Sequence, residues 1–282
     1  MGILIGIILG IIASVIANII GFYTGNRIYT FLKARMHELR SILPFDFTKN
    51  KPIVLAYGSI PPTDITNTHT VEQGDLIALL KAYEIAAMIG KDKSLLVYDG
   101  LSIYSSYELH ANIFTISGPK WNPVTRILLG RLGAPITFTK TPKGIIVKTT
   151  KMKKEHFYEC KKEEAKLQKI CYGVILAGEV ENNSGTKQNV LICSGASTLS
   201  TNGCLLFLSQ LSKSQIKVKQ VQSMGLFRQK KWGLLVKIKN NKSVDSIHSP
   251  LHENDVSITI EKIFFQKDFL PSYLLDTYPN QI

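Results

Sequence analysis

The residues best suited to bind a ligand lie where a predicted strand passes into a predicted helix, at residues 116–125. Gly118 permits a tight turn and a close approach of the backbone to a ligand. Asn122 is a preferred helix N-cap, and the proline after it suits the first helical position. The start of such a helix presents unpaired amides and the positive end of its dipole, which attract anions. We therefore expect a phosphate group to bind through Ser117, Gly118, Asn122 and Thr125; ordinary capping of a helix without a ligand is the alternative.

Charged and aromatic side chains flank this turn. Lys120 and Arg126 add positive charge, which favours an anionic ligand. Trp121 offers a ring on which a nucleobase can stack. These side chains make a nucleotide a candidate for the phosphate-bearing ligand.

Residues 190–203 form a second sequence of the same kind, in which an apolar segment enters a loop rich in glycine and hydroxyl side chains. Backbone amides and hydroxyls in such a loop can wrap phosphate or ribose. The loop lacks the Gly-Lys-Ser/Thr ending of a Walker A motif and the Gly-x-Gly-x-x-Gly of dinucleotide-binding folds. A flexible polar turn is the alternative. The ligand-binding residues expected in this loop, and in the turn after the first strand, are Ser194, Gly195, Ser197, Thr198, Thr201, Asn202, Gly58 and Ser59.

The acids and bases of the chain follow no hydrolase motif, since both Gly-x-Ser-x-Gly and His-Glu-x-x-His are missing. Asp99, at a predicted strand end beside a glycine, is the candidate for chemistry, either as a general base or as a partner for a ribose hydroxyl. We leave open whether the protein is an enzyme and favour a role without catalysis. We expect no metal site and no cofactor, because the cysteines are widely spaced and form no Cys-x-x-Cys. They are expected to be structural thiols: Cys160, Cys171, Cys193 and Cys204.

Short apolar segments alternate with helical patterns in the first half of the chain. Such alternation is typical of an α/β layer with a mostly parallel sheet, in which ligands bind at the carboxyl ends of the strands. The predicted strands are residues 53–57, 94–98 and 112–117, and the predicted helices are residues 70–89 and 123–132.

The second half of the chain alternates apolar and polar residues more often. We predict hairpins at 136–150 and 172–193, a helix at 204–211, and further strands over 217–265. The polar stretch 151–169 is expected to be an exposed insertion or a helix. The fold class is therefore α/β with α+β elements at the C-terminus, a Rossmann-like layered domain preceded by one transmembrane helix.

The N-terminus contains an uncharged, isoleucine-rich run at residues 3–22, long enough to cross a bilayer. No basic residue precedes it, which argues against a cleaved signal peptide, the alternative interpretation. Positive charges follow it, so the positive-inside rule puts the N-terminus outside and the remainder in the cytoplasm, at the cell inner membrane as a single-pass protein. The predicted organisation is a transmembrane helix at 1–24, a juxtamembrane helix and linker at 25–50, a cytosolic ligand-binding α/β domain at 51–270 and a tail at 271–282.

Small or amide side chains recur at intervals of four within the apolar run, at Gly6, Gly10, Ser14 and Asn18. Small residues let two helices approach closely in lipid, and a buried asparagine adds an interhelical hydrogen bond. We therefore expect the anchor to associate into a homo-oligomer, with chance recurrence of glycine as the alternative.

The chain carries 34 Lys and Arg against 21 Asp and Glu, a net charge of +13, and 45% of its residues are hydrophobic. This composition excludes a disordered chain. Residues 182–244 contain ten basic residues and no acid. Membrane lipid headgroups and a phosphate-bearing small molecule are the expected partners of such a stretch, while we do not expect nucleic acid. A basic protein without such a role is the alternative.

Two short motifs, Gly118-Pro119-x-x-Asn122-x-x-Thr125 and Ser194-Gly195-x-x-Thr198-x-x-Thr201-x-Gly203, resemble those of a poorly characterised microbial family. The resemblance covers about residues 50–265. The layout of an anchor and a nucleotide-sensing type of domain is also similar to membrane-tethered effectors of bacterial cyclic-oligonucleotide antiphage systems. This similarity implies a cytosolic domain that binds a cyclic nucleotide in antiviral defence.

Three functions are consistent with these features. The first is a membrane-anchored cytosolic sensor or effector that binds a nucleotide or another phosphate-bearing ligand. The second is a membrane-tethered hydrolase or phosphorylase that acts on nucleosides or nucleotides. The third is a membrane scaffold without a small ligand or a reaction.

Overall fold

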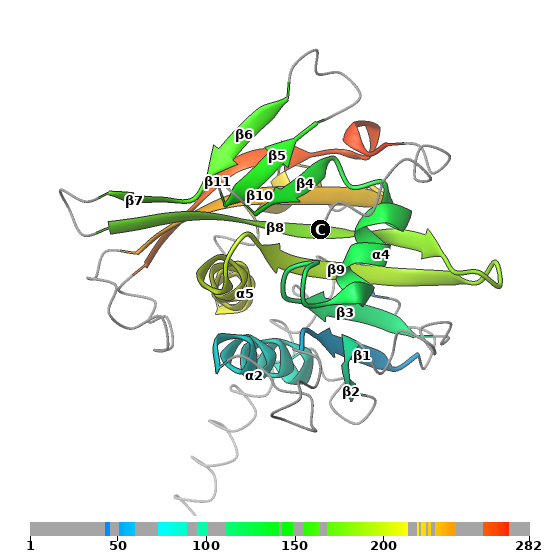
Figure 1. Ribbon diagram of the computed structural model, residues 1–282. Helices are drawn as coiled ribbons and strands as arrows, with labels where there is room; N and C mark the ends of the chain where they lie inside the picture. The colour runs from blue at the N-terminus through cyan, green and yellow to red at the C-terminus, as the bar shows by residue number, and fades with distance from the viewer. Residues whose placement is uncertain are drawn as a thin grey trace, which may run out of the picture.

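The computed structural model describes the chain in segments (Figure 1). The described residues are 43–45, 51–59, 73–88, 95–100, 111–140, 143–148, 155–163, 168–213, 219, 221–223, 225–226, 229–240 and 256–270. The predicted membrane helix 1–24, its association residues, most of the linker 25–50 and the tail 271–282 lie outside them. Within the part that is described, no helix combines the length and the apolar character needed to cross a bilayer.

A mixed sheet of eight strands organises the described residues, in the order β11-β10-β8-β9-β3-β1-β2, with β7 also paired to β8. Neighbouring strands from β2 to β9 run parallel, whereas β8, β10 and β11 pair in antiparallel fashion. The predicted α/β class is confirmed in this form, with the parallel strands in one half of the sheet. The strands are β1 (Ile53–Tyr57), β2 (Leu95–Asp99), β3 (Asn112–Ile116), β7 (Lys161–Glu163), β8 (Gln168–Glu181), β9 (Lys187–Gly195), β10 (Lys231–Asn240) and β11 (Val256–Phe264).

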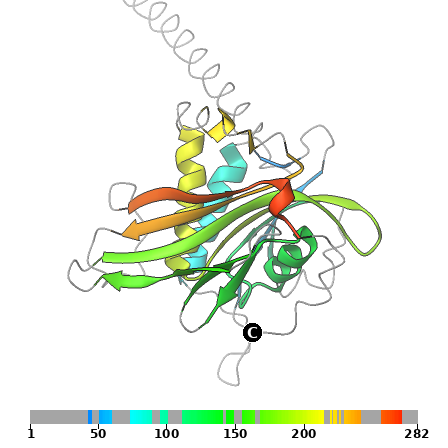
Figure 2. The ribbon, with the colours of Figure 1, turned by 90° about the horizontal axis from the view of Figure 1, so that it is seen from above.

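Helices cover both faces of the sheet, as Figure 2 shows. One face packs against α2 (Gln73–Met88) and α5 (Thr198–Lys213). The other packs against α4 (Pro123–Leu132) and a small antiparallel sheet. That sheet contains β4 (Ile136–Thr139), β5 (Gly144–Val147) and β6 (His156–Glu159), and the short 3-10 helix η5 (Gln266–Asp268) follows β11.

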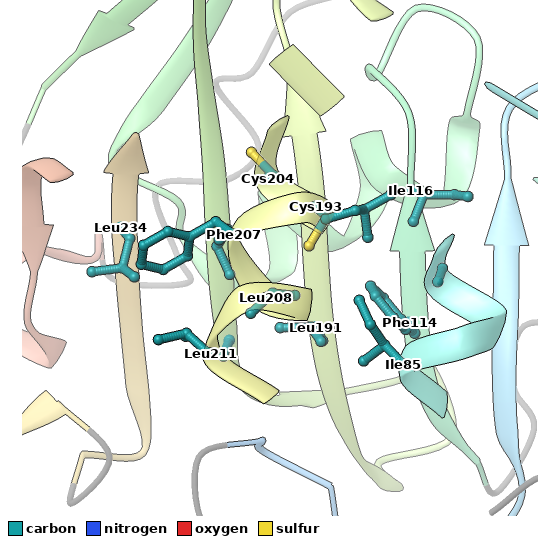
Figure 3. Close-up of a cluster of buried hydrophobic side chains, with 14 of the residues drawn as sticks. Ile85, Phe114, Ile116, Leu191, Cys193, Cys204, Phe207, Leu208, Leu211 and Leu234 are labelled. Carbon is teal, nitrogen blue, oxygen red and sulfur yellow. The ribbon is translucent and has the colours of Figure 1, made fainter. Parts of the chain in front are cut away.

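The core beneath α2 and α5 joins the parallel and antiparallel halves of the sheet (Figure 3). Phe114 of β3 and Leu208 of α5 are each 1% exposed within it. All four cysteines are thiols, and three of them are buried. Burial raises the pKa of the thiols of Cys193 and Cys204, with a further contribution at Cys193 from the neighbouring Cys204, so both stay protonated. Their role in the core is therefore that of small apolar side chains.

The structure corrects two expectations for the second half of the chain. The described part of the stretch 151–169 forms β6, β7 and the start of β8, and no helix, while it is exposed at His156 and Phe157 as the alternative of an exposed insertion predicts. β6 pairs with β5, and its Tyr158 packs edge-on against Tyr172 with ring centroids 5.4 Å apart. The predicted helix at 204–211 begins earlier, at Thr198, so most of the expected polar loop is helical. The hairpins predicted at 136–150 and 172–193 are confirmed.

Two leucines on helices provide a matched test of this packing. Truncation of Leu208, which is 1% exposed, to alanine should lower the free energy of unfolding by about 2–5 kcal/mol, because it leaves a cavity. Truncation of Leu80, which is 60% exposed on α2, should change it by less than about 0.5 kcal/mol. Urea unfolding of the full-length variants measures both, and equal losses would contradict the described core.

Candidate functional site

The connections that leave the parallel strands alternate between the two faces of the sheet. The helices after β1 and β9 lie on one face, and the helix after β3, which lies between them, is on the other. A crevice forms at the carboxyl ends of neighbouring strands where their connections diverge in this way. The strand ends of β1, β3 and β9, together with the end of β2, are therefore the place in this fold where a ligand is expected.

Asn122 is fully buried and bonds to the ends of both β1 and β3. Its side-chain Oδ1 accepts the amides of Val124 and Thr125 at 3.0 and 3.2 Å, which caps α4. Its Nδ2 lies 3.0 Å from the carbonyl oxygen of Ala56 and 2.7 Å from that of Ile116. One side chain thus ties the ends of two strands to the start of the helix.

The rest of the first turn packs closely on the neighbouring strand ends. The amide of Gly58 donates to Ser117 Oγ at 3.3 Å. Ser117 has φ 81°, the one positive value among the described residues other than glycine. A Cβ atom on Gly118 would lie 3.3 Å from the carbonyl oxygen of Gly195, so the turns after β3 and β9 touch. Thr125, in contrast, is buried and bonds to Thr115 across the helix–sheet interface.

The second predicted loop places its residues in two settings. Ser194 is fully buried at the end of β9, and its Oγ has no hydrogen-bond partner among the described residues. The side chains of Val190 and Ile192 belong to the core beneath α4, so the period of two along a strand puts Ser194 on that face also. The register of β3 and β9 ends with the pair Ile116 and Cys193, so Ser117 and Ser194 are the residues that follow directly on the two strands.

The start of α5 is capped from within the chain. The amide of Ser197 donates to Ser200 Oγ at 2.9 Å, and the amide of Ser200 lies 3.3 Å from Ser197 Oγ. Thr198 is partly exposed in the first turn, whereas Thr201 is buried. Asn202 is partly exposed one residue further along α5.

Asp99 lies at the same edge, at the end of β2. Register pairs it with Tyr57, and its carboxylate accepts a hydrogen bond from Ser59 Oγ. The amide of Ser59 in turn donates to the carbonyl oxygen of Trp121 at 3.2 Å. Burial, with a contribution from the Asp99 charge, raises the pKa of the Tyr57 phenol, so this phenol stays neutral.

The charge near the site is modest and local. Lys120 is exposed, and its Nζ lies 3.9 Å from the ring centroid of Trp121. Two lysines of the acid-free stretch 182–244 have counter-charges on neighbouring strands. Lys187 pairs with Glu179 at 3.1 Å and Lys237 with Glu261 at 3.8 Å.

The arrangement can therefore hold a small anion and hydroxyl groups. No group of three potential metal ligands occurs in the described segments. An open hollow, lined by Gln229, Phe265, Gln266 and Lys267, lies beside the end of β11. The strand-end turns are separated from β11 by several strands of the sheet.

Most of the predicted ligand-binding residues are brought to one edge of the sheet. The buried ones among them are Gly58, Ser59, Ser117, Asn122, Thr125, Ser194, Gly195 and Thr201. The sequence does not reveal the roles of Thr115 and Ser200. Thr115 is a threonine inside an apolar strand and Ser200 bonds to the amide of Ser197, and no local pattern indicates either contact. Neither protein-family models nor curated protein sequences give a match to this chain.

Exchange of Asn122 for aspartate tests the tie between β1, β3 and α4. The substitution keeps an acceptor for the α4 amides but turns a carboxylate oxygen toward the carbonyls of Ala56 and Ile116. We expect a loss of about 3–5 kcal/mol in the free energy of unfolding at neutral pH, the usual cost of an unpaired buried charge.

The stability of Asn122→Asp relative to the wild type should depend on pH. Because burial and the facing carbonyls favour the protonated acid, the folded-state pKa of the new carboxyl lies above its unfolded value. The variant is therefore least impaired at mildly acidic pH and loses stability relative to the wild type as the pH rises. Asn183→Asp, at an exposed residue whose oxygen accepts from Arg131, is the control. A deficit that does not depend on pH would contradict the described contacts.

Proposed function

We propose that the protein binds the phosphate group of a nucleotide at the strand-end site, defined as Gly58-Ser59, Ser117-Gly118 and Ser194-Gly195. The observation that carries the proposal is the hydroxyl of Ser194, fully buried without a partner among the described residues, at the end of the strand next to that of Ser117. A buried polar atom without a partner is costly and calls for an explanation. A bound acceptor such as a phosphate oxygen supplies one.

The chemistry of the two serines suits a phosphate. Ser117 Oγ accepts from the amide of Gly58 and retains its own hydrogen to donate. Ser194 Oγ, at the end of the neighbouring strand β9, also has a hydrogen to donate. Both serines are adjacent in the chain to glycines that touch each other, and Gly118 is partly exposed.

The backbone of Ser117 supports the same location. A residue other than glycine with φ 81° costs on the order of 1–3 kcal/mol, and such strain is concentrated at functional sites. Here the close packing against Gly58 holds it in place, because a Cβ on Gly58 would lie 2.9 Å from that of Ser117.

We extend the proposal to the whole chain. The Rossmann-like half of the sheet acts as a cytosolic sensor, residues 1–24 anchor it at the inner membrane, and binding biases the association of the anchors. This extension rests on the amino-acid sequence. The role in antiviral defence stays a prediction from the similarity of layout.

A second candidate function is hydrolysis or phosphorolysis of a nucleoside. It is favoured by the hydrogen bond from Ser59 to Asp99, which orients a carboxylate at the strand edge where it can act as a base. Release of a free base from a nucleoside panel would identify this activity, and Asp99→Asn should abolish it. The scaffold alternative predicts neither binding nor turnover.

Calorimetric titration of the full-length protein in detergent tests the binding proposal, with pyrophosphate, adenosine monophosphate, and cyclic di- and trinucleotides as probes. We expect heat from at least one probe. Ser194→Ala should weaken that binding about tenfold, the effect of one lost hydrogen bond to a charged group. It should not lower the free energy of unfolding of the unliganded protein, because it removes an unpaired buried hydroxyl and no protein hydrogen bond.

Ser209→Ala is the matched control, because Ser209 is also a buried serine but lies far along α5 from the strand ends. It should not alter binding. Absence of heat with every probe, or an equal effect of the two substitutions, would overturn the proposal.

A further inference from the structure

We infer that the ligand of the strand-end site carries a ribose with free 2′ and 3′ hydroxyls, and that the carboxylate of Asp99 holds this diol. The inference rests on the proposed function and adds the second chemical group by which the ligand is recognised. The geometry that points to it is the chain of contacts from Asp99 through Ser59 to Trp121.

The topology sets the separation between the two groups. Asp99 ends β2, Ser117 and Gly118 follow β3, and β1 lies between these strands. Two strand spacings amount to about 10 Å. A ligand that reaches from Ser117 to Asp99 therefore extends across the edge of the sheet, and Ser194 on β9 lies one strand spacing further away.

Ser59 gives the carboxylate a fixed orientation. Its hydroxyl donates to Asp99 and its amide donates to the Trp121 carbonyl, so the end of β2 is tied to the turn after β3. The residue after Asp99 is also fixed, because a Cβ on Gly100 would overlap the side-chain oxygen of Asn122. An ionised carboxylate has two oxygens that only accept, and a vicinal diol presents two donors.

The charges assign a direction to the ligand. A phosphate would be repelled by the Asp99 carboxylate, so the phosphate end belongs at the serines and the neutral sugar end at Asp99. Lys120 and Trp121 lie in the turn after β3, where the ammonium sits 3.9 Å from the centroid of the indole ring and adds positive charge on the side of the serines. Tyr57, paired with Asp99 in register, remains neutral and does not compensate the acid.

Recognition of a diol also selects the type of nucleotide. A 3′,5′-linked cyclic nucleotide has its 3′ oxygen bonded to phosphorus, and thus presents one hydroxyl where a free diol presents two. Asp99 should therefore favour linear nucleotides with a terminal ribose over cyclic ones.

Competitive titration of the full-length protein in detergent is the test, with paired probes that differ in one hydroxyl. The pairs are adenosine, guanosine, cytidine and uridine monophosphates against their 2′-deoxy and 3′-deoxy counterparts. We expect the ribonucleotide of the best-bound pair to bind at least tenfold more tightly than either deoxy form. In Asp99→Asn this preference should fall to about twofold or less, while the deoxy forms bind as to the wild type or more tightly.

Glu155→Gln makes the same chemical change at an exposed acid of the small-sheet region and should keep the preference. Ser59→Ala keeps the charge of Asp99 but removes the hydrogen bond that orients its carboxylate, so it should reduce the preference for ribonucleotides partly. This variant tests the site if Asp99→Asn fails to fold. Equal binding of ribo and deoxy forms to the wild type would overturn the diol inference and leave phosphate binding intact. Loss of all nucleotide and pyrophosphate binding would overturn both.

Discussion

The buried carboxamide of Asn122 is the interaction on which the edge of the parallel sheet depends. It accepts from two amides of α4 and donates toward the carbonyl ends of both β1 and β3. No other side chain type provides both an acceptor pair and two donors in so small a volume. Because β1 and β3 are held at this point, the turns that follow them take up fixed positions, and so does Gly100, which packs on the same amide.

This constraint also decides which groups remain for a ligand. A free helix start attracts anions, but the amides of Val124 and Thr125 in α4 are already paired with Asn122, and the amide of Ser200 in the first turn of α5 lies near Ser197 Oγ. The hydroxyls of Ser117 and Ser194 and the carboxylate of Asp99 therefore carry more of the proposed recognition than the helix starts do. The proposed ligand site is therefore centred on the ends of β3, β9 and β2, and not on the start of a helix.

The local signals in the sequence predict the elements around the site well. Asn122 and Pro123 mark the start of α4, and Gly133 ends it in the left-handed conformation with φ 70°. The hairpin that joins β8 and β9 follows from its asparagine and glycine turn. The ends of these elements depend on neighbouring residues, which is why local patterns suffice.

Other features depend on partners distant in the chain and could not be predicted locally. The pairing of β6 with β5 and the contact of Tyr158 with Tyr172 turn a polar segment into strands. The acids that pair with Lys187 and Lys237 come from neighbouring strands, so these two counter-charges could not be assigned from the basic stretch alone. The register that places Ser117 and Ser194 at neighbouring strand ends spans 77 residues by the difference of their numbers, 194 − 117.

The central claim is that a phosphate group binds at the ends of β3 and β9. Amide hydrogen exchange of the full-length protein, followed by mass spectrometry with and without saturating pyrophosphate, locates binding directly. We predict slower exchange in peptides that cover residues 117–122 and 194–201 and unchanged exchange in β10 and β11. Unchanged exchange at both turns, or slower exchange confined to the hollow beside β11, would contradict the claim.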